Sequence, residues 1–388
     1  MRIAFFSDVY WPMAGGAART LERAVAALAA RGHAVRVYAS TCPLPAGVSE
    51  RPEVHRSPSR PRFVPPGVQW GRRRHSGILA DLAGFEPDVV HCFTEFRMGL
   101  AGAQAARALG VPLVASAHTD CGRSAGRLGL GLLEQLGWHY HRRFYERARL
   151  VLAPGRGYEA HLRARGVRHT GIWGRGVDST EFHPAFRSDA WRARFGVGRA
   201  DVLVTCVGAL AREQGVPLLL DAWARLSRRH AGAHLVFVGR GAMEGAIRGR
   251  ALPRLHLAGL LRGSALATAY ASSDLFVQPF PGESLDNTIL EALASGVASV
   301  SVGTGTVLDR ALDRQDTLLV PPADPAALAA TLAAAIADPG LRRRLQAAGL
   351  ATARARGWNP VIDRLLENYA RIIGGAPPAR PLHPAHAA

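Results

Sequence analysis

The feature that most constrains the fold is a regular alternation of short apolar runs with longer amphipathic stretches. Residues 1–6 read as a buried strand, a helix is predicted over about 17–31, and residues 34–39 form a second strand. The pattern starts again at residues 202–208, with a helix predicted over about 217–229. Strands that are joined through helices predict parallel sheets, and 388 residues are enough for two such domains.

Two candidate site segments of the first half follow predicted strands. Gly15 and Gly16 lie in the loop after the first strand, without the spacing of a dinucleotide fingerprint. His118 follows the strand at residues 112–116, and ligands of open parallel sheets bind at the carboxyl ends of strands. The alternatives are a glycine turn needed only for its backbone geometry and a histidine hydrogen-bonded to backbone beneath a loop.

Residues 282–296 carry the clearest chemical signal of the chain. An apolar strand ends at Pro279, Pro281 and Gly282, and a helical pattern begins near Ser284. Glu283 would then lie in the entry loop and Glu291 two turns into the helix. Helix N-termini favour anions, so two carboxylates there need a reason, and the hydroxyl groups of a sugar and a ribose supply one. The alternative is a pair of solvated carboxylates.

Composition narrows the class of protein. All 48 basic residues are arginine, and 24 of them accompany only 12 acidic residues in the first 170 positions. Arginine stays charged near neutral pH and binds phosphate in bidentate geometry, which favours phosphate groups or anionic lipid as partners. The four cysteines are scattered, which predicts free thiols and no metal site. Neither a membrane-spanning run nor a leader pattern is seen, so we expect a cytoplasmic protein.

Two basic stretches of the first half allow different interpretations. Residues from about 41 to 77 are rich in proline, glycine and arginine and are predicted to be a long loop, with Arg72, Arg73 and Arg74 near its end. Residues 128–149 are predicted to be an amphipathic basic helix region. Solvated surface and packing within the domain are the simpler explanations, and peripheral contact with an anionic membrane is the alternative.

The chain resembles the GT-B glycosyltransferases, in particular family 4 of the retaining enzymes. In its finer sequence pattern it is most similar to bacterial mannosyltransferases that use GDP-mannose. The resemblance covers nearly the whole chain. It rests on Gly15–Gly16, residues 112–118, Arg175 to Asp178 with Phe182 to Pro184, Val207–Gly208, residues 237–239 and residues 283–296. It implies two Rossmann-like domains facing across a cleft, with a C-terminal helix that crosses back to the first domain.

The resemblance also implies roles for the site residues. Glu283 would hold the donor sugar, Glu291 the ribose hydroxyls, and the backbone near Asp286 and Asn287 the diphosphate or sugar. Ser284 and Leu285, which lie between Glu283 and Asp286 in the sequence, would complete the donor site together with the Gly15–Gly16 loop. His118 is the second candidate for a catalytic residue. Members of the family retain anomeric configuration without a required protein nucleophile, so Glu283 is expected to position the sugar.

One departure concerns the phosphate-binding cations. The family commonly has an arginine after the Val-Gly of the first strand of the second domain and a lysine five positions later. Ala209 and Gln214 stand there in this chain. The loss of two positive charges should weaken binding of a diphosphate. Arg212 and Arg240 are the expected replacements, and solvated surface arginines are the alternative. A second departure is Gly303-Thr304-Gly305, where the family often has two adjacent glycines.

These observations predict an α/β protein with an acceptor-binding domain at 1–172, a nucleotide-sugar-binding domain at 173–357, a crossover helix at 358–373 and a disordered tail at 374–388. The expected activity is retaining transfer of a hexose, with mannose the favoured sugar, from a nucleoside diphosphate to a lipid, glycan or small-molecule acceptor. No cofactor beyond the donor substrate is expected. The alternatives are a catalytically impaired scaffold protein and, ranked last, a nucleic-acid binder, for which no motif is present.

Overall fold

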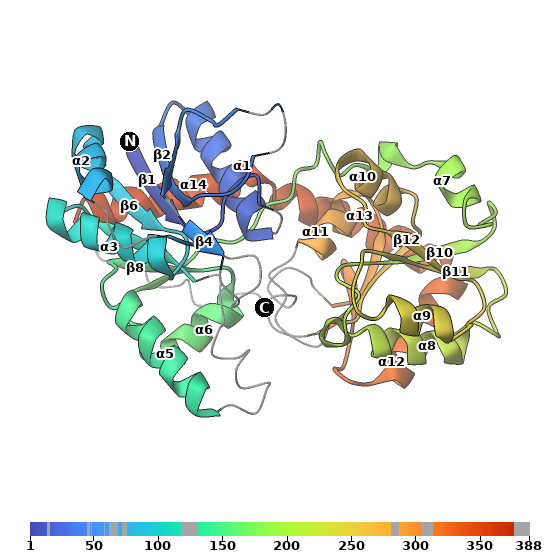
Figure 1. Cartoon of the computed structure of the whole chain (residues 1–388). Helices are drawn as coiled ribbons and strands as arrows, with labels where there is room; N and C mark the ends of the chain where they lie inside the picture. Colours follow the sequence, from blue (N-terminus) through green and yellow to red (C-terminus); the bar gives the residue numbers. More distant parts are fainter. Residues whose placement is uncertain are drawn as a thin grey trace, which may run out of the picture. The chain divides into compact units, whose positions relative to one another are not determined.

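The computed structural model describes residues 1–13, 16–44, 47, 49–57, 59–61, 69–71, 76–117, 131–280, 287–303, 307 and 313–375. The chain divides into two compact units (Figure 1). The first combines Met1–Gly174 with Val361–Ala388, and the second is Arg175–Pro360. Each unit is built on its own parallel sheet and has its own hydrophobic core.

The first unit is wound around a seven-stranded sheet with the order β3-β2-β1-β6-β7-β8-β9. Its strands are β1 (Arg2–Ser7), β2 (Ala34–Ser40), β3 (Val54–Ser57), β6 (Val89–Cys92), β7 (Leu113–Ser116), β8 (Leu150–Ala153) and β9 (Thr170–Ile172), and β4 (Ser59–Pro61) pairs with β5 (Gln69–Gly71) in a separate hairpin. Its helices are α1 (Gly16–Ala30), α2 (Ser76–Phe85), α3 (Arg97–Leu109), α5 (Gly131–Tyr145) and α6 (Arg156–Ala164).

The second unit has a six-stranded parallel sheet with the order β12-β11-β10-β13-β14-β15. Its strands are β10 (Val202–Val207), β11 (Ala233–Val238), β12 (Leu255–Gly259), β13 (Leu275–Gln278), β14 (Ala298–Val302) and β15 (Thr317–Val320). Its helices are α7 (Asp189–Ala193), α8 (Val216–Leu226), α9 (Glu244–Gly249), α10 (Gly263–Ala271), α11 (Thr288–Ala294), α12 (Pro325–Ala337) and α13 (Pro339–Ala355), with short 3₁₀ turns η1 (Pro184–Phe186) and η2 (Arg212–Gln214).

The alternation of side chains along the strands explains why runs such as β10 are apolar at successive positions. Val204 and Cys206 of β10 enter one core cluster, together with residues of α8 and α12, whereas Leu203 enters another, together with residues of α10 and α11. A parallel strand covered on both faces must be apolar at successive positions. Figure 1 shows α8 and α12 on one side of this sheet and α10 and α11 on the other.

The last helix, α14 (Trp358–Ile373), begins in the second unit and continues as part of the first. In the first unit the Tyr369 hydroxyl lies 2.6 Å from His91 Nδ1 of β6, and an Arg149 guanidinium nitrogen donates to the Ile372 carbonyl at 3.0 Å. The predicted fold class, two Rossmann-like domains with a terminal helix that returns to the first, is confirmed.

Two details of the prediction are wrong. The stretch predicted as a long loop from 41 to 77 contains β3, which extends the main sheet beside β2, as well as the β4–β5 hairpin and the start of α2. Helix α11 begins at Thr288, four residues after the predicted start, so Glu291 lies in its first turn. The tail from residue 376 onward lies outside the described residues.

Candidate functional site

The order of the strands places a candidate site in the second unit. From β10 the sheet is wound in one direction to β11 and β12 and in the other to β13, β14 and β15. Ligands of doubly wound sheets bind outside the carboxyl ends of the strands at such a switch point, which here lies between β10 and β13. The loops at residues 208–211 and 279–280 follow these two strand ends.

A crevice lies at this point. It is lined by residues from the ends of β10 and β13 and the starts of α8 and α11, namely Cys206, Val207, Gly208, Ala209, Leu210, Gln214, Val216, Gln278, Pro279, Phe280 and Thr288. Its volume is about 20 Å³, room for roughly one water molecule. The crevice formed by the described residues can therefore hold only a small part of a nucleotide.

Glycines allow the loops around the crevice to approach closely. Gly239 has a φ of +147°, and a Cβ there would lie 1.9 Å from the Gly208 carbonyl oxygen. A Cβ on Gly241 would lie 2.3 Å from the Leu210 carbonyl oxygen, and the Leu210 amide donates to the Arg240 carbonyl at 2.9 Å. The loop after β11 is thus packed backbone to backbone against the loop after β10.

This packing sets the positions of the two predicted phosphate-binding arginines. Arg212 begins η2, just beyond the loop after β10, and Arg240 follows β11. Both side chains are exposed. In the part of the chain that the structure describes, neither guanidinium contacts an acidic or hydrogen-bonding partner. Ala209 and Gln214, at the positions where the family carries its cations, line the crevice itself. The phosphate-binding role of Arg212 and Arg240 stays a prediction.

Glu291 and Asn287 lie beside the crevice in the first turn of α11 and just before it. Glu291 is 7% exposed and accepts a hydrogen bond from the Tyr270 hydroxyl at 3.0 Å. The Asn287 amide donates to the Gly176 carbonyl at 2.7 Å and so ties the start of α11 to residues 174–178. A buried glutamate that is hydrogen-bonded on one oxygen is a fixed acceptor, as a ribose contact would require.

Other predicted site residues are not covered by the described residues. Gly15, His118, Glu283, Ser284, Leu285 and Asp286 lie outside them, and Gly16 is the first residue of α1. Their predicted roles therefore remain predictions.

Asp8 is a site-like residue of the first unit that the sequence reasoning missed. It follows β1, at the switch point between β1 and β6, and is fully buried. Its carboxylate accepts from Thr94 Oγ1 at 2.8 Å and from the Met98 amide at 3.2 Å, at the N-terminus of α3. Burial raises the pKa of Asp8 to about 6, although these hydrogen bonds act in the opposite direction. The only available signal was a single acid directly after a buried strand.

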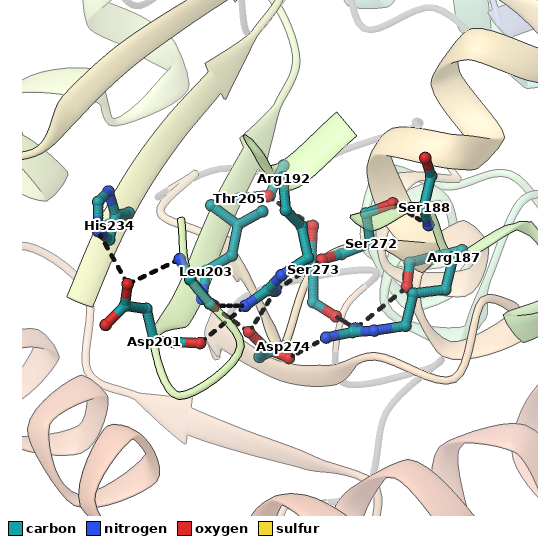
Figure 2. Close-up of polar contacts among 12 residues, drawn as sticks. Arg187, Ser188, Arg192, Asp201, Leu203, Thr205, His234, Ser272, Ser273 and Asp274 are labelled. Carbon is teal, nitrogen blue, oxygen red and sulfur yellow. Dashed lines mark hydrogen bonds and ion pairs between the residues drawn. The ribbon is translucent and has the colours of Figure 1, made fainter. Parts of the chain in front are cut away.

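A charged cluster at the amino ends of the strands of the second sheet has a structural role. Figure 2 shows Asp274, just before β13, between Arg187 and Arg192. Asp274 accepts from Arg192 at 2.8 Å, from Arg187 at 2.9 Å and from the Leu203 amide at 2.8 Å. The Arg192 side chain is 3% exposed and also donates to the carbonyl oxygens of Ser272, Gly198 and Asp201. Every contact is internal, so this cluster holds the amino ends of β10 and β13 together.

Two family models and several known proteins match the sequence of this chain. Residues 14–181 match the family model described as Glycosyltransferase Family 4, and residues 201–338 match that described as Glycosyl transferases group 1. The chain is 35% identical to a GDP-mannose-dependent alpha-mannosyltransferase of Mycolicibacterium smegmatis, over 96% of this chain and 98% of that protein. It is 31% identical to the protein of the same name from Mycobacterium tuberculosis, over 96% and 97%.

A solved structure shows the same fold. Sucrose-phosphate synthase of Thermosynechococcus elongatus superposes with a TM-score of 0.78 and 20% identity, covering 97% of this chain and 100% of that one. At this identity the likeness concerns the architecture alone.

Proposed function

The chain belongs to family 4 of the glycosyltransferases, and from this membership we propose that it transfers mannose from GDP-mannose to a lipid or glycan acceptor with retention of anomeric configuration. That it is a glycosyltransferase follows from the two family matches and the full-length relatives. The choice of donor is carried by one observation, the 35% identity over 96% of the chain to a protein named as GDP-mannose-dependent.

The proposed donor site lies at the carboxyl ends of β10 and β13. The diphosphate would lie over the loop that begins at Gly208, where it is reached by the exposed arginines of η2 and of the loop after β11. Cations placed beside a departing diphosphate stabilise the charge that develops as the sugar–oxygen bond breaks. Arg212 and Arg240 supply this charge in the proposal, in place of the missing cations at Ala209 and Gln214.

The remaining roles follow the family pattern. Glu291 holds the ribose hydroxyls, and its burial and its bond from Tyr270 fix the carboxylate for this task. Glu283 positions the mannose, His118 acts on the acceptor side, and Gly15 and Gly16 approach the donor. An oxocarbenium-like centre is stabilised by a nearby carboxylate, and the acceptor hydroxyl attacks from the face that the diphosphate leaves.

The test is a panel of sugar nucleotides. The protein is incubated with GDP-mannose, GDP-glucose, UDP-glucose and UDP-galactose, with and without a bacterial lipid extract as acceptor, and release of the nucleoside diphosphate is followed. We expect acceptor-dependent release of GDP from GDP-mannose, with the α-anomer in the product by NMR. Glu283→Ala should abolish the release, whereas Arg225→Gln, an exposed change in α8, should leave it intact.

Two results would contradict the proposal. Release from a UDP-sugar in preference to GDP-mannose would overturn the donor assignment. Donor binding by calorimetry without any turnover, unchanged in Glu283→Ala, would instead indicate the impaired scaffold protein.

The proposed site contains no metal, so the same activity is expected in the presence of EDTA. Loss of activity with EDTA would refute a metal-free site.

We further propose peripheral contact with an anionic membrane through α5. No helix of the described residues is long and apolar enough to cross a membrane. On α5, Leu136 is 58% exposed, and Tyr140 and Arg143 follow it at helical spacing and are exposed as well. Such a face suits anionic headgroups. The other predicted basic stretch, Arg72 to His75, lies outside the described residues.

Vesicle sedimentation tests this contact. The protein should sediment with phosphatidylglycerol vesicles at low salt and not with phosphatidylcholine vesicles, and Leu136→Ser should weaken the binding. Equal recovery of the wild type and Leu136→Ser in the pellet would show that α5 is not the contact.

A further inference from the structure

A second concave region lies at the amino edge of the sheet in the first unit. It is formed where α3 ends, where β7 and β8 begin and where α14 ends. Its lining consists of Ala103, Gln104, Ala106, Arg107, Gly110, Val111, Pro112, Leu113, Arg147, Arg149 and Ile373. The cavity volume is about 810 Å³, within the range of pockets that hold organic ligands. We call this region the amino-edge basin.

The basin is strongly basic. Arg107 comes from the last turn of α3, and Arg147 and Arg149 come from the segment between α5 and β8. The lining given by the described residues contains no acidic side chain. Arg149 is held by its bond to the Ile372 carbonyl of α14, so a fixed guanidinium forms part of the wall. Arg107 and Arg147 are exposed, and in the described part of the chain neither has an ionic or hydrogen-bonding partner.

Helix capping does not account for this concentration of charge. At the end of α3 the Gly110 amide donates to the carbonyl oxygens of Ala106 and Arg107, and the Val111 amide donates to the Ala106 carbonyl. Those carbonyl groups are therefore satisfied without any arginine side chain. Three guanidinium groups around one basin repel one another and cannot lose their charge near neutral pH. A bound anion would remove this repulsion.

We propose that the amino-edge basin binds a phosphate-bearing ligand. Guanidinium groups match phosphate oxygens in bidentate geometry, and three of them favour a ligand with more than one negative charge. A cavity of about 810 Å³ is far larger than an inorganic ion, so the ligand carries an organic group as well. A soluble organic phosphate and the headgroup of an anionic phospholipid share this chemistry.

The basin is separate from the proposed donor crevice. Among the residues that the structure describes, the crevice is lined by residues of the second unit and the basin by residues of the first. Within the first unit it also lies at the opposite edge of the sheet from Asp8, because α3 starts beside Asp8 and ends at the basin. The proposal therefore does not depend on the identity of the sugar donor.

The double variant Arg107→Gln/Arg147→Gln tests the proposal, with Arg225→Gln/Arg262→Gln as a control of equal charge on exposed positions of the second unit. Both variants and the wild type are titrated calorimetrically with fructose 1,6-bisphosphate, in saturating GDP so that a donor site is filled. They are also sedimented with phosphatidylglycerol vesicles. Thermal unfolding of each variant verifies that it is folded, and a separate GDP titration reports on the donor site alone.

Loss of about tenfold or more in affinity for the bisphosphate, in the basin variant only, would support a soluble phosphate ligand. Loss of vesicle binding in the basin variant only, where Leu136→Ser has no effect, would support a phospholipid headgroup. The proposal is overturned if the wild type binds neither probe, or if the basin variant and the control variant bind them equally. Failure of GDP to bind would count against the donor proposal and not against the basin.

Discussion

Asp8 and His91 are buried titratable residues of the first unit. Burial disfavours the charged form of each, so the stability that they contribute depends on pH in opposite directions. His91 lies between Ser116 Oγ at 2.7 Å and the Tyr369 hydroxyl at 2.6 Å, and burial lowers its pKa to about 3. Its contribution to stability is present above pH 6.5 and is lost as the pH falls toward 3. Asp8, whose pKa is raised to about 6 from 3.8, contributes most below pH 3.8, and this contribution is lost as the pH rises through 6.

The Asp8 effect can be isolated with Asp8→Asn. The variant should gain stability relative to the wild type as the pH rises from 4 to 7, by about 2–3 kcal/mol in total, because two pKa units correspond to roughly that energy. Urea unfolding at pH 4, 5, 6 and 7 measures the difference. Asp363→Asn, a change in an exposed ion pair with Arg31, is the control. Stability curves of wild type and Asp8→Asn that run parallel with pH would show that Asp8 does not titrate in this window.

Asp274 tests the charged cluster of Figure 2. Replacing it with alanine leaves the buried Arg192 guanidinium without its carboxylate, so we expect a loss of about 3–5 kcal/mol in the free energy of unfolding of the second unit. Asp189→Ala removes an exposed carboxylate 3.9 Å from Arg199 and should change stability by less than about 1 kcal/mol. Denaturant unfolding compares the two, and equal small losses would mean that Asp274 is not needed for the stability of the cluster.

Arg212 and Arg240 are the residues proposed to stabilise the departing diphosphate. Because both would stabilise the departing diphosphate, Arg212→Gln/Arg240→Gln should lower kcat/KM for GDP-mannose by about a hundredfold or more. Arg225→Gln/Arg262→Gln should leave kcat/KM unchanged. Steady-state assays of GDP release measure both. Unchanged kinetics in the first pair would show that other groups hold the diphosphate.

At the scale of elements, α14 is anchored to the first unit by a buried apolar face and by polar contacts near its end. Ile362, Leu365, Tyr369 and Ile372 of this helix are buried, the Tyr369 hydroxyl contacts His91, and the Ile372 carbonyl accepts from Arg149. In Tyr369→Phe the packing is kept, but His91 Nδ1 loses its partner. We expect a loss of about 1–3 kcal/mol in the free energy of unfolding of the first unit.

Chemical unfolding of Tyr369→Phe beside Ile373→Ala, an exposed change in the same helix, measures this anchor. A Tyr369→Phe variant as stable as Ile373→Ala would show that the hydroxyl contributes nothing net.

The same elements show which parts of the fold can be predicted from sequence. Strands such as β10 and β13 are mostly apolar because helices cover both faces, and they are recognisable from sequence alone. β3, with the sequence Val-His-Arg-Ser, lies at the edge of the sheet beside β2 and is largely polar, so its sequence predicts a loop. The sequence predicts the start of α11 near Ser284, whereas the helix begins at Thr288, directly after Asn287. The Asn287 side chain is bonded to Gly176, a contact between distant segments that no local pattern predicts.

The site divides in the same way. Val207–Gly208 and the strand end at Pro279 are recognisable from sequence, whereas the crevice that they help to line was not predicted. Gly208, which lines the crevice, is closely approached by Gly239, and this contact between distant segments is one that no local pattern encodes. Asp8 was missed for a similar reason, because its partners Thr94 and Met98 are about 90 residues away in sequence.

At the scale of the whole molecule, the two units differ in whether they are formed by one continuous segment of the chain or by two. Both core clusters of the second unit fall within residues 175–360, as do the described residues that line the donor crevice. The first unit needs a second, distant segment, since it includes most of α14. We therefore predict that residues 175–360 fold alone and bind GDP with nearly the affinity of the full chain, whereas residues 1–174 do not fold alone.

The reason for the difference is the area that α14 buries. Without it the first unit loses four buried side chains, and burying each is worth about 1.5–3 kcal/mol, which together approaches the 5–15 kcal/mol by which domains are stable. Loss of α14 would also leave His91 without its contact to the Tyr369 hydroxyl. Circular dichroism and calorimetry with GDP on the two fragments provide the measurement, and restoring residues 361–375 to the first fragment as a peptide is the control. A folded 175–360 fragment that fails to bind GDP, when the full chain binds it, would mean that the donor site needs residues of the first unit.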